Sequence, residues 1–304
     1  MSGVVAALIP VFLLIAIGWG ARASRVVTAE QFGAVNRLGY FLFYPAFLFT
    51  TITGSALEIA DAGPFLFGVL GGFACVIAAA LALRLVIRDG PAFTSVFQGA
   101  VRWNGFSLLA AATSLYGAAG ADWIALAFGP LILMINLVCV VVLARWGEGR
   151  GASLRAILDQ IIANPLILAC GAGVAAKLAH VGDLGAATAT LKLLGAAAMP
   201  TALLCVGAGL NIAAVRKAPA LVAASCALRL AFAPAATFAV ATLCGAGPMG
   251  AAMAAGIAST PTAAAAYVLA REMGGDADLM AGIVTATTLL SFITMPIAIA
   301  LAAP

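Results

Sequence analysis

The 304-residue chain is 64% hydrophobic and only 9% charged, with a formal net charge of +4. A soluble domain carries about 25% charged residues, so this chain has too few charges to cover a water-exposed surface, and lipid must cover much of it. Most of the basic residues stand at the ends of apolar segments, so a nucleic-acid partner is not expected. The six cysteines lie inside apolar segments without metal-ligand spacing, so we expect neither a metal site nor another cofactor.

Apolar stretches of about 20 residues, the length of a helix that crosses a bilayer, recur along the whole chain. They predict ten membrane-spanning helices at 3–21, 36–53, 64–87, 92–116, 122–145, 161–179, 190–210, 219–244, 248–271 and 278–302. Alternation of apolar and polar residues over segments of about 10, which indicates a membrane barrel, does not occur in the sequence. The predicted fold class is therefore an all-α polytopic membrane protein.

The longest polar connection, residues 146–160, divides the chain into two units of five helices, 1–145 and 161–304. Because five is an odd number, the second unit must cross the membrane with the opposite orientation to the first. Matched prolines support this inverted repeat, since Pro45 and Pro200 are 155 positions apart and each lies in the second segment of its unit.

The orientation follows from the basic residues, which collect in the cytoplasmic loops of membrane proteins. Eleven of them lie in the odd-numbered connections: Arg22, Arg25, Arg37, Arg84, Arg88, Arg145, Arg150, Arg155, Arg216, Lys217 and Arg271. The even-numbered connections hold only Lys177 and Lys192. The odd-numbered loops, including the connection at 146–160, are therefore predicted to be cytoplasmic. Both termini are then expected outside, in a multi-pass protein of the inner (plasma) membrane.

Polar residues interrupt the fourth and ninth segments at corresponding positions. The breaks are Arg102-Trp103-Asn104-Gly105 and Ser259-Thr260-Pro261-Thr262. Asn104 and Ser259 are 155 positions apart, and paired breaks of this kind point to the substrate site of a secondary transporter. A helix that restarts after a break presents free N–H groups and positive partial charge, which suit an anion. The two breaks together predict a midplane site with two donor-rich ends.

Arg102 and Arg229 are the two charged side chains predicted to lie deep in the membrane, and no deep acidic residue is expected beside them. An arginine keeps its proton, so its partner must be a bound anion or backbone carbonyls. Arg102 could instead extend to the cytoplasmic surface, and Arg229 could contact carbonyls freed near Pro234. Asn136, in the middle of the fifth segment, fits the site and a hydrogen bond between helices equally well.

Short motifs spread over nearly the whole chain carry a family resemblance. They are Leu38-Gly39-Tyr40, Pro45-Ala46-Phe47-Leu48-Phe49, Arg102-Trp103-Asn104-Gly105-Phe106, Asn164-Pro165-Leu166, Pro200-Thr201-Ala202-Leu203-Leu204, Leu228-Arg229-Leu230, Thr260-Pro261 and Ser291-Phe292-Ile293-Thr294-Met295-Pro296. In this order they resemble the auxin efflux carrier family in its bacterial form, which includes malonate and malate carrier-like proteins.

The resemblance implies ten transmembrane helices in two inverted five-helix repeats, with crossover helices four and nine. This is the architecture of sodium–proton antiporters and bile acid symporters. It further implies a scaffold of helices one, two, six and seven, a transport unit of the other helices that moves like an elevator, and homodimers formed through the scaffold. Plant relatives carry a proline in both crossovers, whereas the first crossover here has Gly105 and no proline.

These observations favour a secondary active or facilitative transporter of small organic anions (carboxylates). Its expected substrate-binding residues are Arg102, Asn104, Gly105, Asn136, Arg229, Ser259, Thr260, Pro261 and Thr262. With no deep carboxylate expected to bind a coupling cation, efflux or exchange is favoured over coupled uptake.

Two other functions remain open at this point. One is a sodium- or proton-coupled symporter of the bile acid symporter type, to which Asn104, Ser259 and Thr260 could supply ligands. The other is a membrane receptor that transports nothing, for which the short loops leave little docking surface. No nucleophile has a base beside it in the sequence, so an enzyme is not expected.

Overall fold

The computed structural model describes residues 2–55, 62–148 and 163–303, and within them it contains helices, turns and connecting segments but no strand. The helices are α1 (Ser2–Ala23), α2 (Ala29–Leu38), α3 (Tyr44–Gly54), α4 (Gly63–Ala82), α5 (Gly90–Val101), α6 (Gly105–Trp146), α8 (Pro165–Leu178), α9 (Ala186–Ala196), α10 (Ala198–Ala208), α11 (Ile212–Val215), α12 (Pro219–Ala227), α13 (Ala233–Leu243), α14 (Pro248–Ser259), α15 (Ala265–Glu272) and α16 (Ala277–Ala302).

Six helical stretches in this described part of the chain are long and apolar enough to cross a membrane. They are Gly3–Ala23, Gly63–Leu85, Ala111–Trp146, Ala186–Ala208, Pro219–Leu243 and Ala277–Ala302. Spans of this length and composition make the chain an all-helical, multi-pass membrane protein. Most of the predicted polar connection, residues 149–160, lies outside the described residues.

Two wide, π-helical turns carry the chain through prolines. Gly39–Phe43 joins α2 to α3 just before Pro45, and Leu228–Phe232 joins α12 to α13 just before Pro234. Proline has no N–H to donate, and the wide turn instead closes with a bond from the residue that follows it to its first carbonyl. The chain therefore stays helical across both prolines, and Arg229 lies inside the second turn.

A sharp bend divides α6 into two helical pieces. Gly117 has φ 64° and ψ −149°, a conformation that residues with a side chain rarely adopt. The chain folds back at this bend. The close approach of Gly120 to Ala112 shows this, since a Cβ added at Gly120 would lie 2.4 Å from the carbonyl oxygen of Ala112. The bend falls between the predicted segments 92–116 and 122–145, so the two pieces of α6 follow that predicted boundary.

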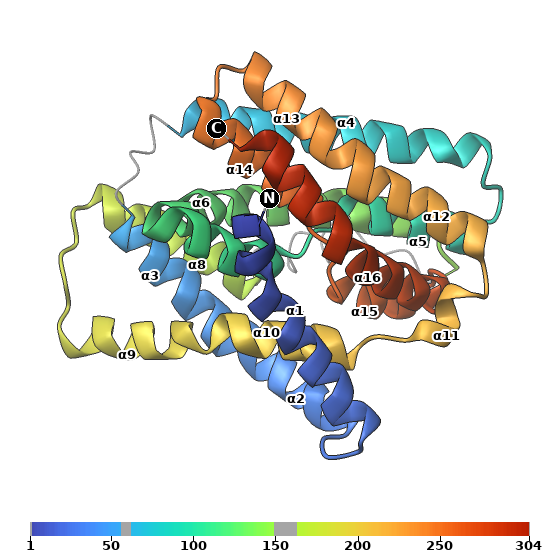
Figure 1. Cartoon of the computed structure of the whole chain (residues 1–304), viewed down its shortest axis with the longest axis horizontal. Helices are drawn as coiled ribbons and strands as arrows, with labels where there is room; N and C mark the ends of the chain where they lie inside the picture. Colours follow the sequence, from blue (N-terminus) through green and yellow to red (C-terminus); the bar gives the residue numbers. More distant parts are fainter. Residues whose placement is uncertain (1, 56–61, 149–162, 304) are drawn as a thin grey trace.

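The helices pack in two groups. Group A consists of α1, α2, α3, α8, α9 and α10, in which α1 packs on α10 and α3 packs on α8 and α9. Group B consists of α4, α5, α6 and α11–α16, in which α4 packs on α13, and α14 packs on α13 and α16. In Figure 1, α2, α9 and α10 of group A lie below, and α4 and α13 of group B lie above. The groups meet mainly through α6, which contacts α1, α3, α8 and α10, and α1 also packs on α16.

Glycines bring the backbones of α1 and α10 into direct contact. A Cβ added at Gly18 would lie 2.0 Å from the carbonyl oxygen of Leu204, and one at Gly207 would lie 1.8 Å from that of Ile15. Lipid tails are as apolar as a helix surface, so close van der Waals packing of this kind is what associates helices in a membrane. The pair α1 and α10 is accordingly a closely packed part of group A.

Candidate functional site

The two predicted helix breaks are present, and each leaves an extended segment inside the protein. The helix α5 ends at Val101 and α6 begins at Gly105, with Arg102 and Asn104 in extended conformations between them. The helix α14 ends at Ser259, and α15 begins at Ala265. Asparagine before glycine, and threonine before proline, favour such an interruption because neither sequence continues a helix well.

Side-chain hydrogen bonds join the two breaks to each other. The N–H of Asn104 donates to Oγ1 of Thr260 at 3.3 Å. The hydroxyl of Thr262 donates to the carbonyl oxygen of Gly99 at 2.7 Å. Thr260 and Thr262 are completely buried, so these bonds form without competition from water. The ends of four helices therefore meet in one place.

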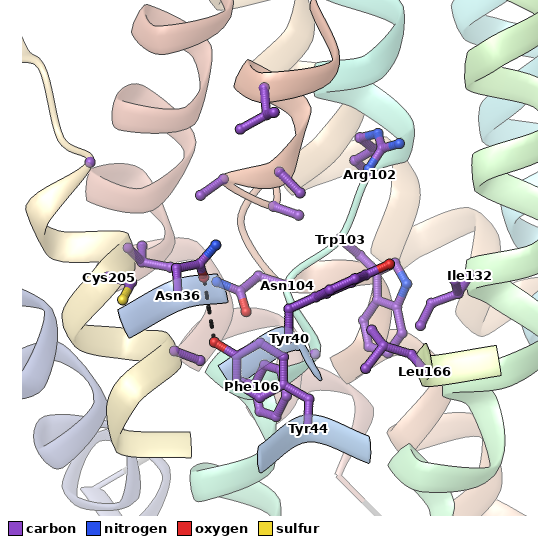
Figure 2. Close-up of a pocket in the computed structure, with 18 of the residues that line it drawn as sticks. Asn36, Tyr40, Tyr44, Arg102, Trp103, Asn104, Phe106, Ile132, Leu166 and Cys205 are labelled. Atoms are coloured by element: carbon purple, nitrogen blue, oxygen red, sulfur yellow. Dashed lines mark hydrogen bonds between the residues drawn. The ribbon is translucent and has the colours of Figure 1, made fainter. Parts of the chain in front are cut away.

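A cavity of about 450 Å³ opens beside this junction, between the two groups of helices. From group A it is lined by residues that include Asn36, Tyr40, Tyr44 and Cys205, and from group B by residues that include Arg102, Asn104, Asn136 and Ala264. Its volume lies in the range of small-molecule sites, about 300–1,000 Å³. Figure 2 shows Tyr40, Asn104 and Phe106 around the same space, with Arg102 above them.

Two helix N-termini face the cavity. Gly105 and Phe106, which open α6, line it, and so do Ala264 and Ala265 at the start of α15. The first N–H groups of a helix have no acceptor within the helix, and the helix dipole adds about half a positive charge there. Both features favour a negatively charged ligand.

The charged side chains of the cavity are basic. Arg102 donates from Nη2 to Oδ1 of Asn136 at 2.8 Å, while its buried Nε has no partner among the described residues. Arg22 donates to the carbonyl oxygen of Ala208. Neither Asp nor Glu occurs among the described residues that line the cavity. Two guanidinium groups without a fixed counter-charge leave the cavity electrostatically positive.

Aromatic rings form the apolar part of the wall. The rings of Tyr44 and Phe106 have centroids 4.6 Å apart, Phe106 and Phe128 5.6 Å, and Phe128 and Trp103 4.8 Å. The hydroxyl of Tyr44 donates to Oδ1 of Asn36 at 3.5 Å, the bond drawn in Figure 2. The cavity thus combines a cationic, donor-rich end with an apolar surface.

The structure separates the expected site residues into two sets. Arg102, Asn104, Gly105 and Asn136 line the cavity. The second set, Arg229, Ser259, Thr260, Pro261 and Thr262, is buried outside it. Arg229 is 0% exposed, and its guanidinium donates to backbone carbonyls at the ends of α5 and α14. Of the alternatives for Arg229, contact with carbonyls is therefore the one observed, although these carbonyls are not the ones near Pro234.

Several cavity residues were not identified from the sequence. Asn36, Tyr40 and Tyr44 project from a helix of group A, and only packing brings them opposite Arg102. Asn164 combines two roles, because it lines the cavity and its side chain also caps α8 by accepting from the N–H of Leu166 at 2.9 Å. Asn36 stands beside Arg37 at the start of the predicted segment 36–53, so nothing in the local sequence marks it as a cavity residue.

One acidic side chain is buried among the described residues. Asp122 is only 7% exposed and lies within α6, five residues beyond the bend at Gly117 and at the start of the predicted segment 122–145. The expectation that no carboxylate lies deep in the membrane concerns depth in the bilayer rather than burial in the protein, and it stays a prediction.

Comparison with known proteins identifies the second half of the chain. No curated protein matches the chain. Residues 152–299 match the model of a family described as membrane transport protein, of which residues 163–299 lie in the described structure. This stretch, which supplies α15 and the wall around Cys205, is the domain of the auxin efflux carrier family, a family of membrane transporters.

Proposed function

We propose that the chain is a secondary transporter of small organic anions, carboxylates in particular, and that the cavity between groups A and B is its substrate site. One observation carries the proposal. The N-termini of α6 and α15 and the guanidinium of Arg102 converge on a cavity whose described lining has no acidic side chain. Such a site favours an anion and disfavours a cation.

Each residue of the site has a role in this proposal. The carboxylate accepts hydrogen bonds from Arg102 and from the free N–H groups that begin at Gly105. Asn136 orients Arg102 through the bond at 2.8 Å. Asn104 offers its side-chain amide beside the carboxylate, and the rings around Phe106 cover the apolar part of the substrate. Thr260 and Thr262 act indirectly, since they hold the two breaks together.

The arrangement of the cavity also favours elevator-type alternating access. One wall belongs to group A, which contains predicted helices one, two, six and seven, and the other wall belongs to group B. A movement of group B along a fixed group A would carry Arg102 and Asn104 from one side of the membrane to the other. We propose this movement together with ten transmembrane helices in two inverted five-helix repeats, and with homodimers formed through group A.

Efflux or exchange is the favoured direction. A membrane potential that is negative inside drives an anion outward by about 2.3 kcal/mol per charge per 100 mV, so uptake would require a coupled cation. The described lining of the cavity has no carboxylate to bind one. The second candidate is a proton- or sodium-coupled symporter, and the buried carboxylate of Asp122 is the observation that favours it.

The experiment that tests the proposal is counterflow in proteoliposomes. Malonate, malate, oxalate and indole acetate are loaded in turn, and uptake of the labelled anion is measured for the wild type, Arg102→Ala and Asn104→Ala. Arg88→Ala is the matched control, because Arg88 is exposed and does not line the cavity. We expect both cavity variants to lose most of the transport and the control to keep it. Undiminished transport by both cavity variants would contradict the proposed site.

A further inference from the structure

Arg229 makes an unusual set of contacts where the two helix breaks meet. Its side chain is 0% exposed, and its guanidinium donates four hydrogen bonds, all to backbone carbonyls. Nε donates to Thr260 at 3.0 Å, Nη2 to Ala258 at 2.6 Å and to Ile257 at 3.4 Å, and Nη1 to Ala100 at 3.3 Å. Every acceptor belongs to the C-terminal end of α14, to the residue after it, or to the C-terminal end of α5.

These carbonyls form a site for a positive charge. The last carbonyls of a helix have no donor within the helix, and each C-terminus carries about half a negative charge. Two such ends meet at Arg229, and the ring of Phe73 lies 5.3 Å from its guanidinium carbon. Unwound carbonyls and half-helix C-termini are the groups that bind coupling cations in transporters with broken helices.

The positive charge among these carbonyls is the guanidinium of Arg229, which is part of the chain. Between described side chains the only ion pair is Lys217–Asp278, so no described carboxylate forms an ion pair with Arg229. The wide turn Leu228–Phe232 places the side chain at the junction, and arginine keeps its proton in a protein. The guanidinium therefore supplies a permanent charge to the carbonyls that a free cation would otherwise neutralise.

We infer that Arg229 is a tethered substitute for a coupling cation, and that it occupies a cation site built from the C-termini of α5 and α14. It acts as a positioning residue. By fastening the two C-termini, it holds the breaks so that the N-termini of α6 and α15 face the cavity. This role adds to the proposed function, and the transport measurement that tests it rests on that function. It implies that transport by the wild type needs neither sodium nor potassium.

The test removes the tethered charge and offers a free one. Arg229→Ala is titrated with millimolar guanidinium, sodium or potassium chloride, with choline chloride as the salt control, and thermal unfolding in detergent is followed. We expect the variant to unfold at a lower temperature than the wild type. Guanidinium should raise its unfolding midpoint by several degrees in a saturable manner, and the wild type should not respond.

Arg84→Ala is the matched control. Arg84 also donates to a backbone carbonyl, that of Ile87 at 2.8 Å, and it lies over the ring of Phe93, but its acceptor is three residues away in its own segment and does not belong to another helix. We expect guanidinium to leave this variant unchanged. Equal responses of the wild type, Arg229→Ala and Arg84→Ala would overturn the inference, because the effect would then come from the salt.

Transport provides the second readout. Arg229→Ala should lose transport by about tenfold or more in choline, since several charge-assisted hydrogen bonds are removed, and guanidinium or sodium should restore part of it. Full transport by Arg229→Ala in choline would overturn the inference.

Further measurements cover the remaining outcomes. If Arg229→Ala does not fold, Arg229→Lys keeps the charge and should fold and transport without an added cation; an inactive, folded Arg229→Lys would also count against the inference. The unfolding measurement needs no substrate, so it remains decisive if the proposed function fails.

Discussion

The guanidinium of Arg102 donates from Nη2 to Oδ1 of Asn136 at 2.8 Å, which connects the first helix break to the middle of the second piece of α6. The bond fixes one end of the guanidinium, and the buried Nε remains without a partner among the described residues. An orphaned buried donor costs free energy unless a ligand or water satisfies it. The geometry is therefore that of a side chain prepared to bind an anion.

Asn136→Asp should weaken binding of the anion. The new carboxylate would pair with Arg102 and neutralise the charge that attracts the substrate, so we expect the KM for a transported carboxylate to rise about tenfold or more. Asn136→Ala, which removes the oriented bond without adding charge, should raise it less. Both values come from initial rates in proteoliposomes, and an unchanged KM in Asn136→Asp would show that Arg102 does not contact the substrate.

Thr262→Val should loosen the junction between the two breaks. The hydroxyl of Thr262 is completely buried and donates to the carbonyl of Gly99 at 2.7 Å, and its loss leaves that carbonyl with one partner fewer. A buried hydrogen bond of this kind contributes about 1 kcal/mol to stability, so the thermal unfolding midpoint should fall. Thr262→Ser keeps the hydroxyl and should restore most of the loss. A midpoint equal to that of the wild type in Thr262→Val would argue that the bond contributes nothing.

Gly18→Ala should damage the contact between α1 and α10 far more than Gly20→Ala. A Cβ at Gly18 would lie 2.0 Å from a backbone oxygen, which cannot move without displacing α10, whereas one at Gly20 meets nothing within 4 Å. Overpacking of this kind costs about 1–3 kcal/mol or more. Yield after purification and the unfolding midpoint measure the difference between two identical substitutions on one helix. Similar behaviour of the two variants would mean that α1 and α10 do not pack this closely.

The breaks could be predicted from the sequence because local residues cause them. Asn104 before Gly105, and Thr260 before Pro261, disfavour a helix wherever they occur. The opposite wall of the cavity could not be predicted, since Tyr44 comes from another helix and only packing brings it near. For Arg229, the sequence is compatible with two kinds of partner, an anion and backbone carbonyls. Choosing between them required the three-dimensional position of the α14 carbonyls.

The predicted orientation places the loop after α1 in the cytoplasm and the loop after α8 outside. Single cysteines at Ser24 and Gly182, both exposed, test this in a background without Cys75 and Cys244, the exposed native thiols. A maleimide that does not cross membranes should label Gly182→Cys in intact cells and Ser24→Cys only after permeabilisation, as the distribution of basic residues requires. The reverse pattern would place both termini in the cytoplasm.

Asp122 distinguishes the two candidate modes of transport. Its carboxylate is the one buried acidic side chain in the described residues, and a buried carboxylate in a membrane helix is a candidate proton carrier. Exchange requires no net proton movement, so Asp122→Asn should leave counterflow unchanged if the chain is an exchanger. A proton-coupled symporter would instead lose uptake driven by a pH gradient in this variant while keeping counterflow. Measuring both rates in the same proteoliposomes, with and without the gradient, separates the two modes, because only the second makes the carboxylate part of the transport cycle.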